Sequence, residues 1–343
     1  MQLAAILGSV LGAFALTAWI SHRFLSPSSF FHILDHPNPR SLHDSPIPRS
    51  GGVAILGGAL LGGVAAVPFL PWSAELAGLA AAALGVGAVS FADDRLGLPR
   101  RYRLAAHLLA GILLILLGLG VDRLDLPGSV TPIAGLWVWP LTLFYVAWMI
   151  NLYNFMDGMD GLAGGMALIG FGALGAIGWI GDDLEFAWPN WVIAAAAGGF
   201  LVWNWPPARI FMGDVGSSAL GFLVAAMSLW GSARGLFPLW VPGLIFSLFI
   251  IDATSTLLRR LFRGERIWEA HRSHHYQRIV QAGWGHRKTL MWSLALMLAC
   301  AATAIQGLGM PPRDQWLVLG AWAGIFIVIG WKTTLLEGRG RLS

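Results

Sequence analysis

The sequence predicts an all-α, polytopic integral membrane protein, and three observations lead to this prediction. Of the 343 residues, 56% are hydrophobic and only 12% are charged, whereas a soluble domain carries about 25% charged residues. The mean hydropathy is +0.67. Eleven apolar segments approach the length of about 20 residues that a helix needs to cross a bilayer. We therefore expect a single transmembrane domain over residues 1–343 with about eleven spans.

The expected spans follow one another with short polar connections, apart from longer polar stretches at 22–50 and 259–289. The first span carries its positive charge at its C-terminal end, which favours a retained helix over a cleaved signal peptide. Glycines inside the spans permit close helix packing, and tryptophans near span ends are typical of an interfacial belt. The expected spans are 1–21, 51–70, 74–92, 104–121, 135–152, 161–181, 187–204, 215–232, 236–258, 290–308 and 315–332.

Lysine and arginine set the expected orientation, because the cytoplasmic loops of membrane proteins are enriched in these residues. With eleven spans, alternate loops fall on opposite sides. Only three of the 22 basic residues, Arg123, Arg234 and Arg313, fall on the side that also holds the N-terminus. We therefore expect the N-terminus outside the cell and the C-terminus in the cytoplasm.

Five polar clusters fall on the expected cytoplasmic side, although the orientation was assigned from basic residues alone. The clusters are SLHDSPIPRSGG at 41–52, SFADDR at 90–95, NLYNFMDGMDG at 151–161, FMGDVGSS at 211–218 and EAHRSHHYQ at 269–277. Acidic groups are costly near a bilayer unless they are paired or functional. Their gathering on one side predicts a single polar site there.

Asp93 and Asp94 are adjacent carboxylates at the end of the third span. They repel each other unless a positive group lies between them. A divalent cation, a phosphate held through a cation, or the nearby arginines, Arg103 among them, would fill that role. The alternative is a solvated helix end.

Asn151, Asn154 and Asp157 recur every three residues and would form a polar stripe on one face of the fifth span. Gly158 would let the backbone approach a ligand. Asp160 would point elsewhere, from the following turn. Oxygen ligands of this kind suit Mg²⁺ or a nucleoside. The alternative is a helix end with incidental polar residues.

Asp214 lies between two glycines, Gly213 and Gly216, just before the eighth span. Its carboxylate is a candidate metal ligand, and free backbone amides there could face a phosphate. A helix N-cap is the alternative, because aspartate is common at that position. The other carboxylates on the same side favour the metal role.

Histidine and arginine dominate the last cluster and its surroundings, but no cysteine accompanies them, which argues against zinc. Binding of phosphate fits better, and a basic loop at an anionic lipid surface is the alternative. Asp252 lies inside a span near its cytoplasmic end, where it is either functional or paired with an arginine. We expect His286 to matter less than His275. The candidate residues are His271, Arg272, His274, His275 and His286.

In this order, the motifs resemble those of the polyprenyl-phosphate N-acetylhexosamine-1-phosphate transferases, which include phospho-N-acetylmuramoyl-pentapeptide transferase. The resemblance covers most of the chain, from PRSGG at 48–52 through DD, NxxNxxDGxDGLAxG and FMGDxGS to HHYQ at 274–277. Members of that family take a sugar 1-phosphate from a UDP-sugar and pass it to a lipid phosphate, with release of UMP.

The resemblance implies roles for individual residues and a Mg²⁺ cofactor for which Mn²⁺ can substitute. The implied metal ligands are Asp214 and Asp157. The implied catalytic residues are Asp93, Asp94, Asp157, His274 and His275, with the first two near the lipid phosphate. The implied substrate-binding residues are Asn151, Asn154, Gly158, Asp160, Phe211, Gly213, Arg103, His271 and Arg272. Among these, Phe211 would stack on the uracil, and Gly158 and Asp160 would lie near it.

The chain departs from the muramoyl-pentapeptide branch at Gly97, where a lysine is expected, and at Ser273, the first position of a usual HHH run. Tyr276 and Gln277 stand where that branch has an aromatic residue and glutamate. The loops look more like the branch that begins O-antigen or other surface-polysaccharide assembly on undecaprenyl phosphate. UDP-N-acetylglucosamine, UDP-N-acetylfucosamine and UDP-N-acetylquinovosamine are the candidate donors.

Two alternatives remain at this stage. One is the peptidoglycan enzyme, phospho-N-acetylmuramoyl-pentapeptide transferase. The other is a secondary transporter, but its charged site would lie near the bilayer midplane, often between inverted repeats, and no repeat is visible here. The resemblance also implies a bacterial inner-membrane location with the site facing the cytoplasm, and a homodimer. We expect no nucleic-acid partner.

Overall fold

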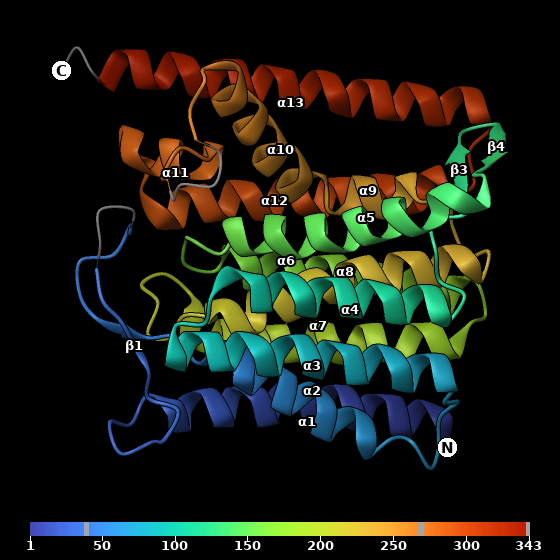
Figure 1. Ribbon diagram of the computed structural model, residues 1–343, viewed down its shortest axis with the longest axis horizontal. Helices are drawn as coiled ribbons and strands as arrows, with labels where there is room; N and C mark the ends of the chain where they lie inside the picture. The colour runs from blue at the N-terminus through green and yellow to red at the C-terminus, as the bar shows by residue number, and fades with distance from the viewer. Residues whose placement is uncertain (38–40, 267–270, 341–343) are drawn as a thin grey trace.

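The computed structural model describes residues 1–37, 41–266 and 271–340, with the side chains of 337–340 excepted. Glu269 and Ala270, with which the last polar cluster begins, lie outside the described residues. The described chain is a bundle of α-helices, most of which lie nearly parallel in Figure 1. The helices are α1 (Gln2–Phe24), α2 (Gly51–Val64), α3 (Ala74–Leu96), α4 (Arg100–Leu116), α5 (Gly135–Phe155), α6 (Leu162–Ile180), α7 (Leu184–Asn204), α8 (Gly213–Ala233), α9 (Trp240–Ile245), α10 (Ser247–Phe262), α11 (His275–Ile279), α12 (Gly285–Gly307) and α13 (Pro312–Gly340).

Strands are confined to two short antiparallel pairs in the described part of the chain. β1 (Leu34–Asp35) pairs with β2 (Ile47–Pro48), and β3 (Arg123–Leu126) pairs with β4 (Ser129–Pro132). The two pairs lie at opposite ends of the bundle in Figure 1. The prediction of an all-α polytopic membrane protein is therefore confirmed.

The number of spans is less simple than the sequence suggested. Eight helices in the described residues are long and apolar enough to cross a membrane, with α11 and α12 counted as one helix through a π-helical turn. The predicted spans at 51–70 and 104–121 correspond to the shorter helices α2, of 14 residues, and α4, of 17 residues. The predicted span at 236–258 is broken into α9 and an inclined α10 (Figure 1). The total of eleven spans and their orientation remain predictions.

Helix α8 is the central helix of the bundle. Its apolar window is 100% buried, whereas only 17% of the window in α13 is buried. Asp214 lies in the first turn of α8. The carboxylate of Asp214 is therefore attached to a helix whose apolar window is fully buried.

Backbone hydrogen bonds join the start of α2 to the segment that precedes α8. Phe211 N–H donates to Pro48 O at 2.7 Å, Gly51 N–H donates to Phe211 O at 2.9 Å, and Gly52 N–H donates to Met212 O at 2.8 Å. The two segments approach so closely that a β-carbon on Gly52 would overlap the backbone of Gly216. Backbone hydrogen bonds therefore hold two of the sequence clusters against each other.

The close approach predicts that Gly52→Ala destabilises the protein. A methyl group there must push two backbones apart, and overpacking of this kind costs about 1–3 kcal/mol. Thermal unfolding of the purified protein in detergent should show a lower Tm. Gly85→Ala in α3 is the matched control, because nothing lies within 4 Å of its new β-carbon. Equal Tm values for the two variants would contradict the packing.

Candidate active site

A polar cavity of about 600 Å³ lies among the loops at one end of the bundle. Four of the five polar clusters supply residues to its wall, and the fifth, at 90–95, is ion-paired to arginines that line it. The sequence prediction that these clusters meet is therefore confirmed for the described residues. The lining includes Asp35, Ser41, His43, Arg49, Arg100, Arg103, Asn151, Asn154, Asp157, Gly158, Asp160, Asn204, Phe211, Gly213, Asp214, His271, His274, Tyr276, Gln277 and His286.

Two arginines balance the carboxylates of α3 and α8. Arg103 Nη1 lies 3.1 Å from Asp93 Oδ2 and 3.2 Å from Asp214 Oδ2. Arg49 pairs with Asp94 at 3.3 Å and also donates to its backbone carbonyl at 3.0 Å. The sequence indicated Arg103. It did not single out Arg49, although Arg49 lies in the PRSGG segment at 48–52 with which the resemblance begins.

Asp157, in the loop between α5 and α6, lies near several other carboxylates. Desolvation raises the pKa of Asp157 well above its usual range, and the neighbouring carboxylates of Asp214, Asp35 and Asp94 raise it further. Asn154 accepts a hydrogen bond from Ser217 Oγ at 2.9 Å. The end of α5, which leads into this loop, and the start of α8 are therefore adjacent, as the sequence predicted.

Asp160 and the buried Asn204 tie this loop to the segment before α8. Ala208 N–H donates to Asp160 Oδ2 at 3.0 Å, and Gly161 N–H donates to Asn204 Oδ1 at 2.8 Å. Asn204 Nδ2 donates in turn to Ile210 O at 2.8 Å. The sequence analysis missed Asn204, since an asparagine at the end of an apolar helix gave no sign of a distant partner.

Phe211 and Gly213 have distinct surroundings in the cavity wall. The Phe211 ring meets the His43 ring edge-on, with centroids 4.9 Å apart. Gly213 has a φ of +72°, and a β-carbon there would overlap the carbonyl oxygen of Arg49. A glycine is thus required at this position by the backbone itself. The proposed stacking of Phe211 on a base stays a prediction.

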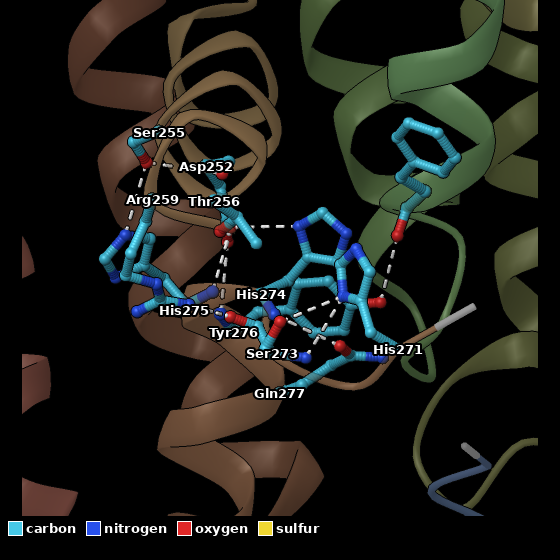
Figure 2. Close-up of polar contacts among 11 residues, drawn as sticks. Asp252, Ser255, Thr256, Arg259, His271, Ser273, His274, His275, Tyr276 and Gln277 are labelled. Atoms are coloured by element: carbon cyan, nitrogen blue, oxygen red, sulfur yellow. Dashed lines mark hydrogen bonds and ion pairs between the residues drawn. The ribbon is translucent and has the colours of Figure 1, made fainter. Parts of the chain in front are cut away.

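Figure 2 shows that the two adjacent histidines point in opposite directions. His274 lines the cavity, and its ring lies 4.8 Å from the ring of His271. His275 turns away, toward Ser255, with Nε2 3.3 Å from the hydroxyl oxygen.

His286, in contrast, lines the cavity with Nδ1 3.2 Å from Asp160. We expected His275 to matter more than His286, but His286 lines the cavity and His275 does not. Arg272 is also absent from the cavity wall in the described chain.

The oxygen donors in the cavity fit a hard divalent cation. Among the residues that the structure describes, no three His, Cys, Asp or Glu side chains already form a cluster that could hold a metal. Asp157, Asp214 and Asn154 nevertheless share the cavity, where burial raises the pKa of Asp157 and the nearby carboxylates raise it further. Carboxylate and amide oxygens are the ligands that Mg²⁺ prefers.

Fold and site together define a polytopic membrane protein whose charged cavity opens among the loops of a helical bundle. Comparison with known proteins takes this further. The family model described as glycosyl transferase family 4 matches residues 76–232. A phospho-N-acetylmuramoyl-pentapeptide-transferase of Shouchella clausii is 31% identical in an alignment over 298 residues that covers 80% of this chain and 89% of that protein. The chain belongs to glycosyl transferase family 4.

Relatives with other names are also similar over most of the chain. A probable undecaprenyl-phosphate N-acetylglucosaminyl 1-phosphate transferase of Bacillus subtilis is 28% identical over 310 residues, covering 90% of this chain and 84% of its own. A decaprenyl-phosphate N-acetylglucosaminephosphotransferase of Mycobacterium tuberculosis is 28% identical over 332 residues, covering 88% of this chain and 81% of its own.

The contact between Gly158 and Tyr276 predicts a specific rescue. A β-carbon on Gly158 would overlap the Tyr276 hydroxyl but would lie 3.3 Å from Cζ of the same ring. Gly158→Ala should therefore lower the Tm in detergent, by an overpacking cost of about 1–3 kcal/mol. Adding Tyr276→Phe should restore most of the loss, because it removes the overlapping oxygen. A double variant no more stable than Gly158→Ala would contradict this contact.

Proposed function

We propose that this protein transfers an N-acetylhexosamine 1-phosphate from a UDP-sugar to undecaprenyl phosphate, with release of UMP. The reaction would begin the assembly of a surface polysaccharide of the O-antigen type at a bacterial inner membrane, with the cavity facing the cytoplasm. The observation that carries the proposal is the meeting of the family's motif residues in one charged cavity. The names of the relatives agree with a polyprenyl-phosphate acceptor.

Both substrates are anionic, so the main task of the site is to reduce their mutual repulsion. Arg49 and Arg103 line the cavity and supply fixed positive charge. Asp214, Asp157 and Asn154 would hold Mg²⁺, which neutralises diphosphate charge when it is bound. His274 and His271 face the same space and would hold a phosphate or sugar oxygen.

The proposed reaction is a direct in-line displacement. An oxygen of the lipid phosphate attacks the β-phosphorus of the UDP-sugar and forms a new P–O bond. The bond from that phosphorus to the bridging oxygen breaks, and UMP leaves with the oxygen. A phosphate monoester with a second pKa near 6 is largely dianionic at neutral pH, so the attack hardly needs a general base. Asp93 and Asp94 would orient the lipid phosphate through Arg103 and Arg49.

A covalent aspartyl-phosphate route is the rival mechanism. Incubation of the enzyme with UDP-sugar labelled in the β-phosphate, without lipid, separates the two routes. We expect no labelled protein adduct. Recovery of such an adduct would exclude direct displacement, but it would not contradict the proposed overall reaction.

Peptidoglycan synthesis is the second candidate, and the similarity to the muramoyl-pentapeptide enzyme of Shouchella clausii favours it. A panel of UDP-sugars that includes UDP-N-acetylmuramoyl-pentapeptide, offered with undecaprenyl phosphate, decides between the two. We expect Mg²⁺-dependent UMP release with a simple UDP-N-acetylhexosamine in detergent, where a transporter would have no compartment to act on. The proposal would be refuted if UMP were released without lipid phosphate. It would also be refuted if no UDP-sugar in the panel gave UMP release.

Asp214→Asn should lower kcat/KM by at least about 100-fold, as expected for loss of a group that stabilises charge in the transition state. Excess Mg²⁺ should not restore the rate. Asp122→Asn, an exposed carboxylate next to the β3–β4 pair at the other end of the bundle, is the control and should keep wild-type activity. Near-normal turnover of Asp214→Asn at high Mg²⁺ would count against the metal role.

A further inference from the structure

Asp252 on α10 is a buried carboxylate whose oxygens are directed at the histidine segment (Figure 2). The residue is 6% exposed. Its Oδ1 accepts from His275 N–H at 2.8 Å and its Oδ2 accepts from Tyr276 N–H at 3.1 Å. The same Oδ1 lies 3.3 Å from Nδ1 of His274 and accepts from the Thr256 hydroxyl at 3.2 Å. The arginine partner considered from the sequence is therefore replaced by a backbone turn and an imidazole.

The backbone contacts explain how the segment keeps its shape. Helix α11 has only five residues before it passes into a π-helical turn, so its start benefits from partners outside the helix. The first amides of any helix lack partners within it, and Asp252 supplies them for His275 and Tyr276 from a neighbouring helix. Gln277 Oε1 accepts from His274 N–H at 3.3 Å and completes the start of the turn.

The ring contact goes beyond what a helix cap requires. A carboxylate beside Nδ1 favours the proton on that nitrogen, so Nε2 becomes the nitrogen that can meet a ligand. His274 lines the cavity, and its ring packs against the rings of His271, Tyr276 and Phe155, with centroids 4.8, 5.9 and 6.0 Å away. His275 packs on the opposite side, toward Ser255. One carboxylate therefore selects which of two adjacent histidines faces the cavity.

We infer that Asp252 is a positioning residue for group transfer, which holds His274 so that its Nε2 meets a phosphate oxygen of a substrate in the cavity. The inference rests on the proposed function for the identity of the substrates. The phosphate belongs either to the nucleotide sugar or to the lipid, and both present the same chemistry to an imidazole.

A double-mutant cycle tests the connection between the two residues. Asp252→Asn retains the size of the side chain but replaces one acceptor with a donor, which opposes the amides and the ring. Loss of such an orienting partner typically costs about 10–100-fold in activity. We expect that loss in kcat/KM for Asp252→Asn in the wild-type background, and less than about twofold in the His274→Ala background. Equal losses in both backgrounds would overturn the inference, because a purely structural role would act regardless of His274.

The separate KM values assign the phosphate. In Asp252→Asn, a rise in the KM for the UDP-sugar alone places His274 at the diphosphate. A rise in the KM for undecaprenyl phosphate alone places His274 at the lipid head group. Either result supports a phosphate contact. Unchanged KM and kcat for both substrates in Asp252→Asn would refute it. Ser255→Ala is the matched control on α10, since it removes the hydroxyl near His275 and should change kcat/KM by less than about twofold.

Hydrogen exchange gives a readout that does not depend on turnover. The amides of His275 and Tyr276 should exchange slowly in the wild-type protein and much faster in Asp252→Asn, while α8 stays protected in both. Unchanged exchange in the variant would overturn the positioning role. A wild-type protein that is inactive with every UDP-sugar but shows this exchange pattern would instead refute the proposed function alone.

Discussion

The burial of like charges at the end of an apolar bundle is the constraint on which the site depends. Asp94, Asp157 and Asp214 come from three different helix ends. Burial raises the pKa of Asp157, and the carboxylates of Asp214 and Asp94 raise it further. Arg49 and Arg103 offset part of this charge. Removing either cation would leave a carboxylate without a partner in a low-dielectric setting, which is far more costly than losing a surface ion pair.

The cavity keeps its shape through bonds between loops that are distant in sequence. The segment before α8 is held by the start of α2 on one side and by Asn204 and Asp160 on the other. These partners are mostly backbone groups, so the geometry depends on glycine positions and amide side chains more than on the charged residues themselves. The buried helix α8 follows this segment directly and carries Asp214 in its first turn.

Much of this architecture could be predicted from the sequence, because apolar runs, basic-residue bias and polar clusters are local signals. The meeting of Asp157, Asp214 and His274 followed from loop parity alone. The break between α9 and α10, the turning of His275 toward Ser255, and the partners of Arg49 and Asp252 did not follow, because they arise from helix inclination and contacts between distant segments. The sequence ranked His286 below His275 because nothing local shows that α12 brings His286 beside Asp160.

The position of the cavity at one end of the bundle has a consequence for the lipid product. Under the proposed reaction, the acceptor head group enters and leaves through the same membrane face, and its hydrocarbon tail never changes leaflet. The attached sugar makes the head group larger and more polar, so unaided passage through the hydrocarbon layer becomes even slower. Under the same proposal, movement of the product to the other leaflet is a separate step that the transfer reaction does not drive.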